Sequence, residues 1–183
     1  MQKIKFYGIG GQGAVTAAKI LSVAVSLHMN EYAVTIPAYG HERRGAPVYA
    51  HIIVDSEPVL LNCYVYEPDI VAVFDDNLLD MGVNIAEGCS GKAVLVLNSA
   101  DPEKIARCKA MGCFEKIYVC DATGAAIANI GLNIPNSAML GALAKTGVVT
   151  IEAVKAAVIE SFGKRGEKNG NAAEYAYEHT EEA

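Results

Sequence analysis

The sequence lacks an excess of basic residues and a long uninterrupted hydrophobic run, and its net charge is −6. The negative charge argues against nucleic acid or an anionic membrane as the main partner. The expected helix over residues 15–29 carries polar residues such as Thr16, Lys19 and Ser22, so we expect no segment that crosses a bilayer. Met1 leads directly into the first expected strand rather than into a signal peptide, so we expect a cytoplasmic protein.

The cysteines also lack any paired spacing. There are five of them, an odd number that suits a reducing compartment, and none forms a C-x-x-C pair. Iron–sulfur ligands come as tight runs of such pairs, so we expect this chain to hold no cluster. His28 and His51 have no second ligand at metal spacing, and we therefore expect no metal site. The five cysteines are Cys63, Cys89, Cys108, Cys113 and Cys120.

What the sequence does contain is an alternation of strand and helix patterns, which predicts an α/β domain. With 183 residues, 52% of them hydrophobic, the chain can bury one sizeable core. We expect a single three-layer α/β/α sandwich with a mostly parallel but mixed sheet of the Rossmann-like type. The expected strands are 3–7, 32–36, 48–54, 59–61, 70–74, 93–97 and 117–120. The expected helices are 15–29, 77–86, one that starts at 102, 122–130, 137–145 and 151–162.

Two regions depart from strict alternation. The turn over residues 55–58 predicts a hairpin between strands 48–54 and 59–61, which makes the sheet mixed. After residue 163 the sequence becomes polar and rich in glycine, so we divide the chain into an α/β domain, 1–163, and a C-terminal segment, 164–183. That segment is either a short helix over 172–179 that docks through Tyr175 or a tail that orders only against a partner.

A glycine-rich turn follows the first strand: Gly8, Gly10 and Gly13 fit G-x-G-x-x-G, with Gly11 and Gln12 between them. Such a turn places unpaired backbone N–H groups and a positive helix end where an anion can bind. The alternative is that these glycines only allow close packing of helix on strand.

An NAD site would need an acidic residue at the end of the second strand, about 20 residues further on. Strand 32–36 instead runs into Pro37, and the nearest acid, Glu31, lies at its other end. The sequence therefore lacks the acidic residue that a dinucleotide site needs in addition to the glycine turn.

The loop after the second strand carries Arg43 and Arg44 beside Glu42. Arginine forks suit phosphate and carboxylate, so this loop is predicted to bind coenzyme A or a partner subunit. The alternative is that the arginines are solvated or lock a turn. The neighbouring residues expected at an interface are Tyr39, Glu42, Gly45 and Pro47. Tyrosine is enriched at interfaces, and Tyr39, Tyr49, Tyr64 and Tyr66 lie around this loop, although they equally fit a half-buried sheet face.

Three further polar residues lie near the edge of the sheet where α/β proteins bind ligands. Asp75 and Asp76 follow a buried strand, and Asn136 opens a helix. Helix capping explains all three as well as ligand binding does. No arrangement of nucleophile and base is visible, so we name no catalytic residue.

Four motifs in order resemble the gamma subunit of the 2-oxoacid (pyruvate, ketoisovalerate or 2-oxoglutarate):ferredoxin oxidoreductases. They cover most of residues 4–162 and comprise the glycine turn with the alanine-rich helix start after it, 42–48, 66–71 and 136–143. The resemblance implies a subunit of an enzyme of anaerobic metabolism that oxidatively decarboxylates a 2-oxoacid to its acyl-CoA and passes electrons to ferredoxin.

The resemblance also implies a division of labour between subunits. Thiamine diphosphate, Mg²⁺ and the iron–sulfur clusters would lie on the alpha, beta and ferredoxin-like delta subunits, because this chain also lacks a Gly-Asp-Gly motif for the thiamine. The chain alone would be inactive, and it would supply structure and part of the CoA site through the glycine turn, Arg43, Arg44 and Asn136. The alternatives are a stand-alone nucleotide- or NAD-binding module and a ligand-free assembly scaffold.

Overall fold

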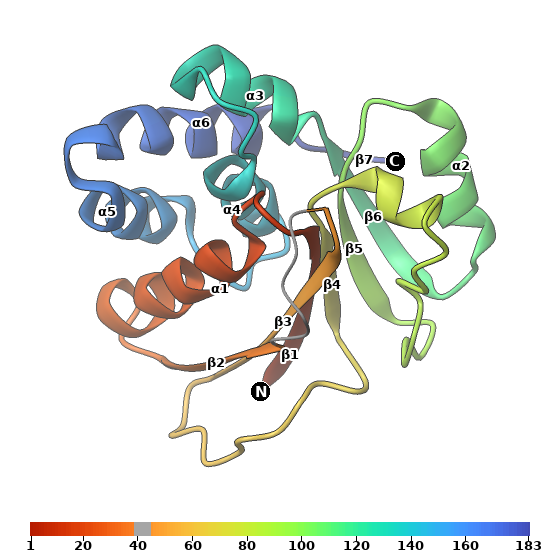
Figure 1. Cartoon of the computed structure of the whole chain (residues 1–183). Coiled ribbons are helices and arrows are strands. Elements are labelled where there is room, and N and C mark those ends of the chain that lie inside the picture. Colours follow the sequence, from red (N-terminus) through yellow and green to blue (C-terminus); the bar gives the residue numbers. More distant parts are fainter. Residues whose placement is uncertain (39–44) are drawn as a thin grey trace.

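A computed structural model describes residues 1–38 and 45–183 (Figure 1). In this part of the chain the strands form one sheet of seven, in the order β2-β3-β1-β4-β5-β6-β7. The strands are β1 (Gln2–Ile9), β2 (Tyr32–Ala38), β3 (Pro47–Asp55), β4 (Ile70–Val73), β5 (Ala93–Asn98), β6 (Phe114–Cys120) and β7 (Glu181–Glu182). The helices are α1 (Ala14–Val23), α2 (Pro102–Ala110), α3 (Ala122–Ile130), α4 (Asn136–Ala144), α5 (Ile151–Phe162) and α6 (Gly166–Glu178). Shorter turns of helix are η1 (Ala24–His28), η2 (Asp76–Leu79) and η3 (Gly163–Arg165).

Strand β1 lies at the centre of the sheet and is bonded on both sides. It pairs parallel with β4, which continues parallel through β5 to β6, and antiparallel with β3. Strand β2 pairs antiparallel with β3, and β7 antiparallel with β6. The predicted α/β class with a mixed sheet is therefore confirmed.

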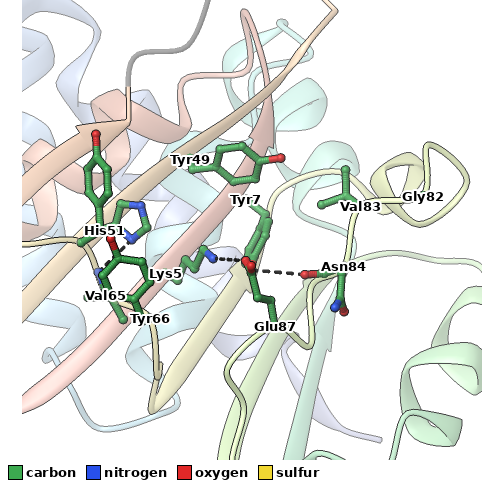
Figure 2. Close-up of a pocket in the computed structure, with 11 residues that line it drawn as sticks. Lys5, Tyr7, Tyr49, His51, Val65, Tyr66, Gly82, Val83, Asn84 and Glu87 are labelled. Atoms are coloured by element: carbon green, nitrogen blue, oxygen red, sulfur yellow. Dashed lines mark hydrogen bonds and ion pairs between the residues drawn. The ribbon is translucent and has the colours of Figure 1, made fainter.

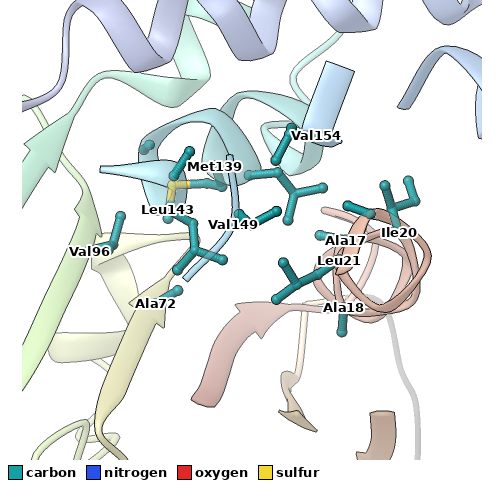
Figure 3. Packing of buried hydrophobic residues seen from close by; sticks show 14 of the residues in the cluster. Ala17, Ala18, Ile20, Leu21, Ala72, Val96, Met139, Leu143, Val149 and Val154 are labelled. Atoms are coloured by element: carbon teal, nitrogen blue, oxygen red, sulfur yellow. The ribbon is translucent and has the colours of Figure 1, made fainter. Parts of the chain in front are cut away.

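Helices cover both faces of the sheet. Because successive side chains of a strand point to opposite faces, β1 sends Ile4 and Phe6 into one hydrophobic cluster and Tyr7 into another. The larger cluster lies beneath α1, α3, α4, α5 and α6, and Figure 3 shows Leu21 of α1 facing Leu143 of α4 within it. The smaller cluster lies on the other face, where Cys108 of α2 packs.

The predicted hairpin is wrong in its partner. Strand β3 forms its hairpin with the preceding β2, and residues 59–61 form no strand. The physical reason is that β3 is already bonded to β1 on one side and to β2 on the other, which leaves no edge for a further strand. Leu60 is accordingly 92% exposed.

Two expected helices are also corrected. The helix expected over 77–86 is the single turn η2 followed by further turns, one of which needs Gly82 at a φ of +75°. The helix expected over 15–29 is α1 followed by the wider turn η1, which ends at His28.

The C-terminal segment forms a longer helix than expected, and it packs through small residues. Helix α6 begins at Gly166 and buries Ala172, Ala173 and Ala176 against α4 and α5. Tyr175 is not the docking side chain, because it is 46% exposed and stacks on His179 with ring centroids 3.9 Å apart. The backbones of α4 and α6 approach closely at the helical residue Gly141.

This close approach predicts opposite outcomes for two helical glycines. A Cβ at Gly141 would collide with the backbone carbonyl of Ala173, so Gly141→Ala should destabilise the chain by about 1–3 kcal/mol or more. A Cβ at Gly170 of α6 would meet only the flexible Ile159 side chain at 3.4 Å, so Gly170→Ala should be neutral or stabilise by up to about 1 kcal/mol. Urea unfolding of both variants measures the difference, and equal effects would contradict the described crossing of α4 and α6.

Candidate functional site

The glycine turn joins β1 to α1, and two of its glycines have steric reasons to be there. Gly13 is the N-cap of α1 at a φ of +79°, a left-handed conformation that other residues rarely adopt. A Cβ on Gly8 would lie 2.7 Å from the Cβ of Ala14, so Gly8 lets the start of α1 approach β1. Close packing therefore accounts for Gly8, while Gly13 leaves the helix end without a side-chain cap.

Backbone hydrogen bonds tie the turn to the start of β3. The Gly10 N–H donates to the Ala46 carbonyl at 2.9 Å, and the Gly45 N–H donates to the Gly10 carbonyl at 3.4 Å. Pro47, the first residue of β3, pairs in register with Ile9. Of the loop residues predicted to bind, Gly45 and Pro47 therefore lie at the glycine turn, whereas Tyr39, Glu42, Arg43 and Arg44 lie outside the described residues.

Gln12 belongs to the framework of the turn. Its Oε1 accepts from the Ile9 N–H at 3.1 Å, and its Nε2 donates to the carboxylate of Asp75. Asp75 also accepts from the Asn77 N–H at 2.9 Å and is the N-cap of η2, as the capping interpretation predicted. Asp76 accepts from the Ser99 hydroxyl at 2.5 Å and from the Lys104 ammonium at 2.8 Å.

These carboxylates line a polar cavity of about 250 Å³ at the carboxyl ends of β4, β5 and β6. α/β proteins often bind ligands at this edge, but Asp75, Asp76 and Asp121 all face the cavity here. Their negative charge disfavours phosphate on this side of the glycine turn.

Asn136 brings a second helix end to the turn. It is the first residue of α4, whose N-cap is Pro135, and it is 5% exposed. A Cβ on Gly13 would lie only 2.8 Å from the Asn136 Nδ2. The N-termini of α1 and α4 therefore meet, and neither has an acidic residue in its first turn. Two positive helix ends at one place favour a bound anion.

The cysteines do not form a ligand set for an iron–sulfur cluster. Cys108 and Cys120 belong to hydrophobic clusters on opposite faces of the sheet, and Cys63 is exposed. Burial raises the pKa values of the Cys89 and Cys108 thiols to about 11, which disfavours the thiolates that a cluster needs. Among residues 1–38 and 45–183, no three His, Cys, Asp or Glu side chains gather as they would around a metal ion.

A second cavity, of about 530 Å³, lies on the face of the sheet opposite α1 (Figure 2). We call it the tyrosine pocket. The sequence did not predict this pocket as a site. Alternation along β1 and β3 does place its floor residues on one face of the sheet, and the sequence left its tyrosines open between an interface and a half-buried sheet face. Tyr49 and Tyr7 pack edge to face with centroids 5.4 Å apart. The pocket is lined by Lys5, Tyr7, Tyr49, His51, Tyr64, Val65, Tyr66, Gly82, Val83, Asn84 and Glu87.

The floor of the tyrosine pocket holds a buried cation and a neutral imidazole. Burial alone would lower the pKa of Lys5, but the hydrogen bond to Glu87, at 2.9 Å, and the neighbouring Tyr7 side chain raise it, so Lys5 stays charged. Burial and the nearby Lys5 charge lower the pKa of His51. The Nδ1 of His51 accepts from the Val65 N–H at 3.2 Å, which leaves the imidazole proton on Nε2.

Comparison with known proteins decides the family. The sequence matches the family described as pyruvate ferredoxin/flavodoxin oxidoreductase over residues 3–179. The chain belongs to this family. The pyruvate synthase subunit PorC of Methanocaldococcus jannaschii is 44% identical over 97% of this chain and 96% of that protein. The common gamma subunit of the pyruvate/ketoisovalerate oxidoreductases of Pyrococcus furiosus is 42% identical over 99% and 98% of the two chains.

Solved structures agree with the sequence comparison. The pyruvate oxidoreductase subunit PORC of Thermotoga maritima superposes with a TM-score of 0.83 at 33% identity, over 100% of this chain and 98% of that one. A 2-oxoglutarate:ferredoxin oxidoreductase of Magnetococcus marinus, 18% identical with a TM-score of 0.69, shares the fold over 97% of this chain and 30% of its own longer chain.

The chain is thus the gamma subunit of a pyruvate/2-oxoacid:ferredoxin oxidoreductase, as the four motifs predicted, and the stand-alone alternatives gain no support. It is one subunit of a multi-subunit oxidoreductase complex. None of the helices described is long and apolar enough to span a bilayer.

The lowered pKa of His51 predicts a pH dependence of stability. The unfolded state binds a proton on this imidazole at a higher pH than the folded state does, so the stabilisation is present above about pH 6.5 and is lost as the pH falls through the folded pKa. We expect the free energy of unfolding to fall between pH 7.5 and pH 5 in the wild type. His51→Gln, whose amide oxygen can accept from Val65, should flatten this slope, whereas the exposed control His179→Gln should keep it. An unchanged slope in His51→Gln would place the titration elsewhere.

Proposed function

We propose that this gamma subunit supplies the phosphate-binding part of the coenzyme A site in the assembled oxidoreductase. The observation that carries the proposal is the meeting of two helix N-termini, α1 at Gly13 and α4 at Asn136, with no acid in either first turn. Helix N-termini are established binding sites for phosphate, because their free N–H groups and their dipoles both favour negative charge. Coenzyme A is the substrate of this enzyme class that carries phosphates.

The arginines complete the proposed site through their place in the chain. Arg44 is joined covalently to Gly45, whose N–H donates to the glycine turn at Gly10. Arg43 and Arg44 can therefore add two guanidinium groups close to the two helix ends. The carboxylates of Asp75 and Asp76 lie in the neighbouring polar cavity, where Gln12 and Lys104 bind them. Because these two side chains already satisfy the carboxylates, we place the phosphates on the side of the turn next to Gly45.

The redox and thiamine chemistry is assigned to partner subunits. Burial raises the pKa values of the Cys89 and Cys108 thiols, no three metal-ligating side chains gather among the described residues, and the sequence has no Gly-Asp-Gly motif. We therefore place thiamine diphosphate, Mg²⁺ and the iron–sulfur clusters on the alpha, beta and ferredoxin-like delta subunits. The odd number of cysteines fits a reducing compartment, which supports a cytoplasmic enzyme.

The proposal predicts a specific defect for the double variant Arg43→Ala, Arg44→Ala. Hydrogen bonds to a charged phosphate are worth roughly 1.5–3 kcal/mol each, so the KM for CoA in the reconstituted enzyme should rise about tenfold or more. The melting temperature of the isolated chain should change little, because the proposal gives the arginines a role in binding CoA and none in the fold of the free chain. A normal KM with failed assembly would show that the arginines bind a partner's carboxylates. A large loss of thermal stability in the isolated chain would show that they are structural.

A charge placed between the helix ends provides an independent test. Asn136→Asp keeps the side-chain oxygen that accepts from Ser137 and adds one negative charge beside Gly13. We expect the KM for CoA to rise about tenfold, with kcat at saturating CoA retained. The matched control is Asn133→Asp, which adds the same charge at an exposed residue of the polar cavity. Equal effects of the two variants on KM would argue against a phosphate at the helix ends.

A further inference from the structure

One half of the sheet is covered by helices on a single face. Strands β2 and β3 pack against α1 on one side, but on the other side the irregular segment 56–69 runs across them (Figure 1). Segment 56–69 and the loop 82–87 form the wall of the tyrosine pocket above Lys5, Tyr7, Tyr49 and His51 (Figure 2). This half of the sheet therefore keeps a hollow that no helix of the described chain fills.

The pocket contains a hydrogen-bond donor that is open to solvent. His51 is 6% exposed, and its Nδ1 already accepts from Val65. Its Nε2–H is free to donate into the pocket, because no hydrogen bond joins it to residues 1–38 and 45–183. No side-chain N or O atom of the described residues is buried without a partner, so this N–H is open to water, which an acceptor on a partner protein would replace.

Segment 56–69, which supplies Tyr64, Val65 and Tyr66 to the pocket, exposes further apolar side chains outside it. In segment 56–69, Leu60 is 92% exposed, Leu61 43%, Tyr64 44% and Tyr66 72%. Apolar and aromatic side chains exposed together in one short segment mark a protein interface more often than a ligand site. Tyrosines around a central pocket are the usual composition of an interface hot spot.

The rim also carries negative charge at one side. A Cβ on Gly88 would collide with the Tyr66 carbonyl, so the two loops touch and bring Glu67 close to Glu87. Lys5 neutralises one carboxylate of this pair, while Glu67 forms no ion pair with the described part of the chain. A basic side chain on the partner would complement the remaining charge.

We propose that the tyrosine pocket and segment 56–69 form the docking surface for another subunit of the same oxidoreductase. The partner inserts an apolar or aromatic side chain between Tyr49 and Tyr66, presents a carbonyl oxygen to the His51 Nε2–H, and places a lysine or arginine beside Glu67. The proposal rests on membership of a multi-subunit enzyme and not on the coenzyme A site, because the surface lies on the face of the sheet opposite α1 and α4.

The exposed Cys63 within segment 56–69 provides a direct probe of this surface. Iodoacetamide should alkylate Cys63 in the isolated chain and at least tenfold more slowly in the assembled oxidoreductase, measured by mass spectrometry of the peptide that contains it. Buried Cys108 and Cys120 should react slowly in both states and serve as internal controls. An equal rate for Cys63 in the two states would overturn the proposal. Protection of Cys63 in the isolated chain by added CoA or pyruvate would overturn it in favour of a small-ligand site.

Two exposed tyrosines provide a matched pair of variants. Tyr66→Ala should weaken the binding of the chain to its purified partner subunits by about tenfold or more, while Tyr175→Ala on α6 should leave that binding unchanged. The melting temperature of each isolated variant checks that neither change unfolds the chain. If assembly with Tyr66→Ala is as tight as with Tyr175→Ala, the docking surface lies elsewhere. The KM for CoA separates the two proposals, because Tyr66→Ala should leave it unchanged once the enzyme is assembled.

Discussion

The contact between Gly13 and Asn136 sets the positions of the two helices on which the proposed coenzyme A site depends. Gly13 is both left-handed and within van der Waals contact of the Asn136 side chain, so a larger residue there would push α4 away from α1. Because α4 in turn packs on α6 at Gly141, this region is built from backbone approaches that only small residues allow. The result is two helix ends directed at one place without a carboxylate between them.

The acidic cavity, the start of β3 and the tyrosine pocket lie at different places on the sheet. At its carboxyl edge, the acidic cavity over β4, β5 and β6 lies on one side of the glycine turn, and the start of β3, which leads back to the arginines, lies on the other. The tyrosine pocket lies on the face without α1, where burial lowers the pKa of His51 while the hydrogen bond to Glu87 keeps Lys5 charged despite its burial. The proposed anion site and the proposed docking surface therefore use different residues of one domain.

Hydrophobic periodicity predicted the strands and most helices, because their buried side chains are large and regularly spaced. It failed where the space around a segment, rather than its hydrophobic pattern, determines the structure that forms. Residues 59–61 read as a strand, but β3 had no free edge, and α6 was placed too late because its buried face is alanine. The motifs singled out the glycine turn and Asn136 as candidate binding residues, and this stays a prediction; their contact with each other could be seen only in the structure. The tyrosine pocket needed the structure, since residues as distant as Lys5 and Glu87 meet only after folding.

Hydrogen–deuterium exchange of the assembled enzyme can show whether coenzyme A phosphates bind at the two helix ends of this subunit. Exchange would be followed by mass spectrometry with and without saturating CoA. We expect slower exchange of the backbone amides at residues 10–16 and 136–139 with CoA, and equal protection of segment 56–69 in both conditions. Protection by CoA elsewhere in the enzyme, with both helix starts unchanged, would contradict the proposed site.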